Sequence, residues 1–341
     1  MTKKATKKLA LTSILSIFAA IYFLSTTNSL LATRLNRGIS NRTRVILSKI
    51  TGIFDFSLFE ILLFISPLLI FLAVIYICKA KNREDVKSRS ATIALILSIS
   101  FVPYTFCIGI AKNSNDLSEK IINTSWYGTY EDVMDTANYL SDTLCSMDRG
   151  RELSVPAIDA EVAISYKKLS EKYSLPEGTQ QKTKRFIFAD LFSKFGVLGL
   201  YSPIGEININ DNIPQYMIPF TIAHEFAHTL GASSEADANF LAYTICTASD
   251  KPFIRYSAML SVLEYFMAED SKIYTNVYKN LAIEVKNDLK EWEIYESRHT
   301  SKIGAALDLA SGTYLDVTDK HGKKSYSEIV RYVTAYHLGI K

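Results

Sequence analysis

Three long apolar runs occupy the first third of the chain and determine its expected organisation. Residues 9–33, 61–78 and 91–111 contain no charged side chain. A helix needs about 20 residues to cross roughly 30 Å of hydrocarbon. We therefore predict three transmembrane helices, at about residues 9–31, 56–78 and 91–111, with Glu60 at a membrane surface. Together they would form a membrane anchor over residues 1–111.

The first apolar run also has an interpretation as a cleaved signal peptide. Such a peptide begins with basic residues, and the run follows Lys3, Lys4, Lys7 and Lys8. No convincing small-x-small cleavage site closes the run, however, and two further apolar runs follow it. A retained membrane helix is therefore the better interpretation.

The loop between the first and second runs has an amphipathic pattern. Apolar residues recur at helical spacing opposite three basic ones; the apolar set is Val45, Ile46, Ile50, Ile53 and Phe54, and the basic set is Arg42, Arg44 and Lys49. This pattern predicts a short helix in the membrane interface, with the basic side chains reaching towards the headgroups.

The distribution of lysine and arginine predicts the orientation. With the N-terminus in the cytoplasm, that side collects nine basic residues, against five in the loop on the other side. Cytoplasmic loops carry the excess of basic residues. Three spans would then place everything after Ala111 outside the cytoplasm, with the lipid bilayer as a partner.

Beyond Lys112 the chain is mixed in charge and has helical periodicity, without repeats or a proline-rich linker. We expect one domain over residues 112–341. Apolar residues recurring every three or four positions predict helices over residues 130–148, 157–173, 214–230, 234–248, 252–268, 272–295 and 325–337. The clearest strand signals are residues 196–201 and 205–210. The expected fold class is mainly α with a small β-sheet.

Charge and cysteine content exclude several kinds of protein. The net charge is only +3, and no arginine-rich or aromatic-interleaved stretch suggests a nucleic-acid groove. None of the four cysteines has the CxxC spacing of a thiolate zinc site. Cys145 and Cys246 could form a disulfide in an oxidising compartment or could be two isolated buried thiols, and the sequence leaves both open.

The clearest chemical motif is HExxH at residues 224–228. Two histidines four apart on a helix project from one face, so His224 and His228 can bind one Zn²⁺ ion. Glu225 points about 100° around the helix, where it can take a proton from a zinc-activated water. The pattern occurs by chance in roughly one chain of this length per hundred. The uncharged residues around it are typical of a helix that lines a buried cleft.

A tetrahedral zinc site that keeps one position for water needs a third protein ligand. Gly231 can end the motif helix in a left-handed cap, and the resulting turn would bring Glu235 close to His228. Glu235 could instead only complement the dipole of the next helix, in which case Asp237 is the alternative metal ligand. Asn239 lies one turn beyond Glu235 and could orient a ligating histidine by a hydrogen bond.

These residues resemble known metallopeptidase signatures. HExxH, with Thr221 three positions before it, resembles the zincin signature, and Glu235 with Ala238 and Asn239 looks like the element that supplies the third ligand in gluzincin membrane proteases. Those families have aspartate where this chain has Asn239. Residues 224–243 are similar to an uncharacterised bacterial family of three-span membrane proteins, known as a domain of unknown function and placed among the zincins. The similarity extends over most of the chain, but glutamate is commoner in that family at the position of Asp237.

The resemblance implies further site residues. Zincins commonly bind substrate as an added strand along an edge strand upstream of the motif helix. Residues 205–210 occupy that place in the sequence, which suggests Gly205, Glu206, Ile207 and Asn208 as substrate-binding residues. A side-chain donor for the oxyanion would be expected from Tyr326, or else from His299, Tyr314 or His321.

The sequence therefore predicts a membrane-anchored, zinc-dependent endopeptidase with an extracytoplasmic catalytic domain. One alternative is an inactive membrane receptor or scaffold that keeps a zincin fold for binding, although such a protein has no use for Glu225. Another is an intramembrane protease. The uncharged run before His224 is too short for a span and contains Pro214 and Pro219, so the motif helix is expected to lie outside the membrane.

Overall fold

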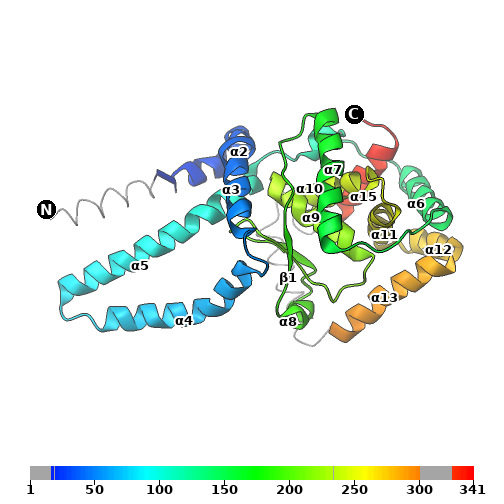
Figure 1. Ribbon diagram of the computed structural model, residues 1–341. Helices are drawn as coiled ribbons and strands as arrows, with labels where there is room; N and C mark the ends of the chain where they lie inside the picture. The colour runs from blue at the N-terminus through cyan, green and yellow to red at the C-terminus, as the bar shows by residue number, and fades with distance from the viewer. Residues whose placement is uncertain (1–16, 19, 233, 300–324) are drawn as a thin grey trace.

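Two long helices leave the globular part of the molecule as a hairpin (Figure 1). The computed structural model describes residues 17–18, 20–232, 234–299 and 325–341, with side chains in the last range from Ser327 onward. The hairpin consists of α4 (Leu58–Cys78) and α5 (Arg83–Tyr104). Both are long and apolar enough to cross a membrane, and none of the apolar window of α4 is buried. Since a soluble core helix would be covered, these helices indicate association with a membrane.

The first predicted span lies largely outside the described residues. Residues 20–27 are helical, and Asn28 interrupts the helix earlier than the predicted end at residue 31. The Asn28 side chain accepts a hydrogen bond from the Leu31 N–H and thereby caps α2 (Ser29–Leu35). Asparagine is a preferred N-cap, which explains the break.

The amphipathic loop forms a helix as predicted, with Arg42 and Lys49 exposed and Arg44 as the exception among its basic residues. Helix α3 (Asn41–Thr51) follows the π-helical turn η1 (Asn36–Ser40). Arg44 is only 1% exposed and Ile46 is 57% exposed. The expectation that Arg44 reaches towards headgroups is therefore wrong, because its guanidinium binds carbonyl oxygens inside the protein.

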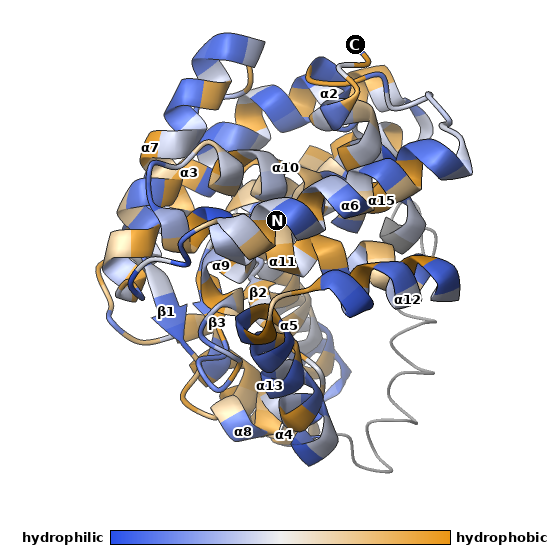
Figure 2. Cartoon of the chain, turned by 90° about the vertical axis from the view of Figure 1, so that its right-hand side faces the viewer, coloured by the Kyte–Doolittle hydropathy of each residue, from blue (hydrophilic) through white to orange (hydrophobic). Residues whose placement is uncertain are grey.

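The globular part is built mainly from helices, as predicted. They are α6 (Tyr130–Ser146), α7 (Val155–Tyr173), α8 (Ala189–Lys194), α9 (Met217–Leu230), α10 (Glu235–Thr247), α11 (Pro252–Glu269), α12 (Ser271–Asn280), α13 (Ile283–His299) and α15 (Ser325–His337). The single helix predicted over residues 272–295 is two helices, because Leu281 adopts an extended conformation with ψ 141°. Figure 2 shows hydrophilic and hydrophobic residues alternating around α6, α12 and α13, as expected for helices with one buried side.

Helix α10 lies at the centre of the core. Its residues from Ala236 to Cys246 are all buried. It packs against α9, α11, α15 and α7. The helix pair α9 and α10 is thus held on several sides, which makes it a rigid platform for side chains at its ends.

A three-stranded sheet covers α9 from the side of the hairpin (Figure 1). Strands β1 (Thr183–Arg185), β2 (Gly199–Tyr201) and β3 (Ile207–Ile209) are ordered β1-β3-β2. Strand β3 pairs in parallel with β1 and antiparallel with β2. The expectation that residues 205–210 form an edge strand is therefore wrong, since β3 is central and its backbone is paired on both sides. The sequence pattern did not reveal β1 or α8.

Buried ionic contacts fix the start of α4 to this sheet. The Glu60 carboxylate accepts hydrogen bonds from Ile187 N–H (2.7 Å) and Phe188 N–H (2.8 Å). Glu206 in turn accepts one from Phe59 N–H at 3.0 Å and forms a buried ion pair with Lys184. Carboxylates at the free N–H groups of a helix start are favourable. These contacts cross the domain boundary expected at residues 111–112, so the globular part includes side chains from the anchor.

All four cysteines are free thiols. Cys246 is buried and Cys145 is exposed, and the Ala282 N–H lies 3.2 Å from the Cys145 sulfur. The interpretation as two isolated thiols is confirmed, except that only Cys246 is buried.

Candidate metal centre

The HExxH residues lie on α9, the helix that ends at the predicted glycine cap. Gly231 has φ 94° and closes α9 in the left-handed conformation, which glycine adopts without steric cost. Ser234 then begins α10, and its hydroxyl accepts a hydrogen bond from the Asp237 N–H at 3.1 Å. This tight reversal places Glu235, the first residue of α10, opposite the histidines.

Three side chains converge at this reversal. The Nε2 atoms of His224 and His228 lie 3.2 Å apart. One oxygen of Glu235 lies 3.1 Å from the His224 Nε2, and the other lies 3.7 Å from the His228 Nε2. Ligand atoms around a tetrahedral Zn²⁺ at 2.0–2.1 Å are about 3.3 Å apart. The spacing of the three side chains therefore fits the donor set of such an ion.

The outer nitrogens of both histidines are already bound to acceptors. The His224 Nδ1 lies 2.8 Å from the Asn239 Oδ1, so the hydrogen bond expected from Asn239 is present. The His228 Nδ1 lies 3.4 Å from the Ala232 carbonyl oxygen. Because an acceptor at Nδ1 holds a proton there, Nε2 is the ring nitrogen that faces the shared point, and it can bind a metal ion when its own proton is lost. His224, His228 and Glu235 could hold a metal ion.

Asp237, the alternative ligand, points away from this cluster. Its carboxylate is fully buried and accepts hydrogen bonds from Leu117 N–H (3.0 Å) and Ser118 N–H (2.8 Å). These donors belong to the start of η4 (Ser118–Lys120), the turn that follows the anchor. Asp237 therefore connects α10 to that turn, and the structure brings Glu235 rather than Asp237 to the histidines.

The cluster is electrostatically coupled. Burial lowers the pKa of His224, but the hydrogen bond and charge of Glu235 outweigh this and raise it to about 9. Burial raises the pKa of Glu235, whereas the hydrogen bond from His224 brings it down to about 2. Glu235 is thus ionised at neutral pH, as a carboxylate ligand must be.

Glu225 lies next to the cluster and contacts β2. It is only 6% exposed, and burial, reinforced by the charge of Glu235, raises its pKa to about 7. A backbone hydrogen bond from Tyr201 and the charge of His224 favour the ionised form. A carboxyl group that titrates near neutrality can both accept and return a proton.

Within the described residues, β2 rather than β3 is the outer strand of the sheet beside Glu225. The Ser202 N–H donates to the Glu206 carbonyl and the Asn210 N–H donates to that of Leu198, both at 2.8 Å. Bonded residues alternate along an antiparallel pair, so the backbone groups of Gly199 and Tyr201 point away from β3. The outer strand of the sheet on this side is thus Gly199–Tyr201 and not residues 205–208, and its Tyr201 N–H donates to the Glu225 carboxylate.

Gly199 leaves room for Glu225, and its substitution should displace that side chain. A Cβ at position 199 would lie 2.7 Å from the Glu225 Oε1 and 2.8 Å from the Thr221 Cγ2. If the cluster binds zinc and Glu225 acts as the base beside it, Gly199→Ala should lower turnover about 100-fold, because a 1 Å displacement of a reacting group costs that much. Bound zinc, measured by mass spectrometry, should then stay at the wild-type level. Wild-type turnover in this variant would contradict the placement of Glu225.

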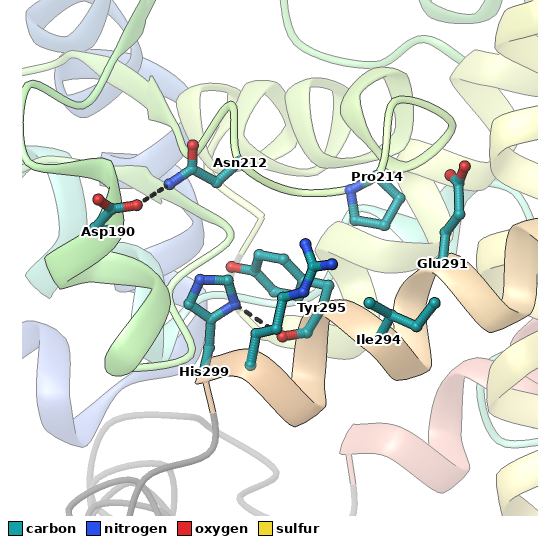
Figure 3. A pocket seen from close by; sticks show the side chains of 8 residues that line it. Asp190, Asn212, Pro214, Glu291, Ile294, Tyr295 and His299 are labelled. Carbon is teal, nitrogen blue, oxygen red and sulfur yellow. Dashed lines mark hydrogen bonds between the residues drawn. The ribbon is translucent and has the colours of Figure 1, made fainter.

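The expected oxyanion donors are not among the residues that this cluster brings together. His299 lies in a separate pocket of about 530 Å³ between α8 and α13, with its Nδ1 2.8 Å from the Tyr295 carbonyl (Figure 3). Tyr314 and His321 lie outside the described residues. Tyr326 is in the first turn of α15, but its side chain also lies outside the described part.

Sequence reasoning missed the residues that hold the reversal from outside. Arg44 donates to the Thr229 carbonyl at 2.8 Å and to the Leu230 carbonyl at 3.3 Å. The Asn36 amide donates to the Gly231 carbonyl at 2.9 Å, and its oxygen accepts from Arg44 at 2.8 Å. The anchor side of the chain thus satisfies the free carbonyl groups at the end of α9. No local sequence signal identifies this role, since the contacts span nearly 200 residues.

Comparison with known proteins identifies the family of the chain. No curated protein and no solved structure matches it. One family model does, over residues 36–334, and its description is "Protein of unknown function (DUF3810)". The match begins at Asn36, so it includes Arg44 and the hairpin as well as the candidate metal centre. Because it covers most of the sequence, the chain belongs to the DUF3810 family of proteins of unknown function.

Proposed function

We propose that this protein is a zinc-dependent endopeptidase of the zincin type. The observation that carries the proposal is the convergence of two histidine Nε2 atoms and the Glu235 carboxylate at separations of 3.1–3.7 Å. Both outer nitrogens are occupied by acceptors, so the Nε2 atoms face the shared point. Glu225, with a pKa of about 7, is the adjacent base.

The roles of the residues follow from their positions. His224, His228 and Glu235 would hold Zn²⁺, which when bound acidifies water and polarises a carbonyl group. The Glu225 carboxylate would take a proton from water and return it to the leaving amine. Asn239 would hold the His224 ring in the orientation that its 2.8 Å contact defines. The outer edge of β2, at the Gly199 backbone groups and the Tyr201 carbonyl, would bind the substrate backbone by strand addition.

Two neighbouring acids provide the direct test of the metal assignment. We expect Glu235→Gln to remove most bound zinc and all measurable peptide cleavage in the purified full-length protein. Asp237→Asn should keep zinc, because this carboxylate binds the backbone of residues 117–118 instead. Zinc content and cleavage of a fluorogenic peptide library are measured on each variant. Zinc loss in Asp237→Asn with retention in Glu235→Gln would refute the assignment.

We also propose the membrane topology predicted above. The hairpin of α4 and α5 would cross the bilayer, and a first span would precede α2 to give an odd number of crossings. The globular part would then lie outside the cytoplasm. Reporter fusions after residue 112 should be active only outside the cytoplasm, and activity inside would refute this orientation.

A further inference from the structure

A row of large apolar side chains is exposed around α8. Ile187, Phe188, Leu191 and Phe195 are exposed by 56%, 51%, 38% and 47%. Phe188, Leu191 and Phe195 are spaced by three and four residues, so they share one side of the chain. The intervening Phe192 is buried, at 7% exposure. Helix α8 therefore turns one apolar side inward and a second one outward.

This outward side is continuous with the start of the apolar helix α4. The rings of Phe64 and Phe188 are 4.7 Å apart between centroids. The Glu60 carboxylate also binds the backbone N–H groups of Ile187 and Phe188. The chain that leads into α8 is thus fixed to the first two turns of α4, and Figure 2 shows the two helices at the same end of the molecule.

The length of α4 determines the depth of that contact. Its 21 residues rise about 30 Å, which equals the hydrocarbon thickness and leaves no surplus. Phe64 follows Leu58 by six residues, or about 9 Å along the axis. When α4 spans a bilayer, the side chain that packs on Phe64 is level with the hydrocarbon. We propose that the outward side of α8, formed by Ile187, Phe188, Leu191 and Phe195, is a lipid-docking surface that seats the globular part on the membrane.

A second exposed apolar segment supports the bilayer as the occupant. Ile46, Ile50 and Ile53, before the start of α4, are exposed by 57%, 52% and 75%. Basic side chains accompany both segments: Lys49 and Lys194 are exposed and can reach lipid phosphates. Exposed apolar residues of α3, of the segment that follows it and of α8 therefore accompany the start of the apolar helix α4. A second copy of the chain that covered α8 would not explain the exposed residues at positions 46–53.

The docking surface also indicates a substrate class, which rests on the proposed peptidase function. Gly199 follows Phe195 by four positions, a distance of at most about 14 Å in extended chain. Gly199 belongs to the outer strand β2 beside Glu225. The substrate would then be a polypeptide segment held at the bilayer surface, such as one adjoining a transmembrane helix or a lipid anchor.

Tryptophan quenching by brominated lipids tests the docking. Phe188→Trp and Phe195→Trp each add one tryptophan to the native Trp126 and Trp292 in full-length protein in phosphatidylcholine nanodiscs. We expect lipids brominated near the headgroup to quench about half of the added fluorescence. The control Tyr274→Trp lies on α12, away from the hairpin, at a position 43% exposed, and should not be quenched. Leu69→Trp, near the middle of α4, should be quenched most by deeply brominated lipids.

Two results would overturn the docking proposal. In the first, Leu69→Trp is quenched, but tryptophan at positions 188 and 195 is quenched no more than at position 274. Crosslinking between copies at position 188 would then identify a second chain as the occupant. The other is an unquenched Leu69→Trp, which would show that α4 does not insert. Neither readout requires zinc or turnover, so failure of the peptidase proposal leaves them valid.

A paired peptide tests the substrate class separately. One peptide that the enzyme cleaves is compared with the same peptide carrying a C-terminal lipid anchor, in nanodiscs that hold the full-length protein. We expect kcat/KM to be at least 10-fold higher for the anchored form. Equal values would refute the substrate class and leave the docking surface unaffected, whereas cleavage of neither peptide would count against the peptidase proposal.

Discussion

Glu225→Gln should abolish peptide cleavage while leaving zinc in place. Glutamine matches glutamate in shape but cannot take a proton, and a general base contributes roughly 10²–10⁴-fold to a rate. We expect turnover to fall by about 1,000-fold or more. Zinc should remain because the donor atoms are those of His224, His228 and Glu235. The measurements are single-turnover cleavage and zinc content of the same preparation.

The same variant has a second readout that does not depend on activity. Burial raises the pKa of Glu225 from its ordinary 4.5 to about 7, so folding favours the neutral acid. That contribution is complete below pH 4.5 and is lost as the pH rises towards 7. In zinc-free protein, Glu225→Gln should therefore gain stability over wild type as the pH rises from about 4.5 to 7. The thermal midpoints of the variant and the wild type are compared at pH 5 and at pH 8. The same difference between them at both pH values would contradict the buried placement of Glu225.

Arg44→Met should destabilise the globular part more than any surface substitution. The guanidinium is 1% exposed and binds carbonyl groups of Thr229, Leu230 and Asn36. Methionine keeps much of the volume but leaves these buried oxygens without a donor, at a cost of about 3–5 kcal/mol. The charge also complements the C-terminal end of α9. We expect a thermal midpoint roughly 10 °C lower and weaker zinc binding, because the reversal before Glu235 loosens.

Arg42→Met provides the matched control. Arg42 lies on the same helix but is exposed, so its substitution should change stability by less than about 0.5 kcal/mol. Thermal unfolding of the full-length variants in detergent distinguishes the two. Arg44→Met with the wild-type midpoint would show that the anchor does not support the reversal. A lowered midpoint with unchanged zinc affinity would separate the stability role from the positioning role.

The positions of the helices and of the candidate site residues could be predicted from local pattern. Apolar residues that recur every three or four positions identified the helices around the site, and α10 begins at Glu235 within one residue of its predicted start. Gly231 predicted the end of α9, since only glycine readily adopts φ 94°. HExxH predicted that His224 and His228 project from one face of a helix, because a helix fixes the relative directions of its side chains.

Contacts between distant segments could not be predicted in this way. Periodicity assigned Arg44 to the polar side of a surface helix, but the carbonyl groups that bind it belong to residues 229–230. The short strand β1 has no alternating pattern because its three residues Thr183–Arg185 gain their order from pairing with β3. The placement of β3 at the centre of the sheet depends on that same pairing.

The choice between Glu235 and Asp237 as the third candidate ligand shows most clearly what each level determined. The sequence by itself determined that Glu235 and Asp237 were both candidates, because each lies in the first turn of α10. Only the tertiary structure decided between them. The backbone N–H groups of Leu117 and Ser118, some 120 residues earlier, bind the Asp237 carboxylate, and Glu235 is left facing the histidines. A local pattern fixes the direction of a side chain on its own helix, whereas the partner that satisfies a buried charge comes from the fold as a whole.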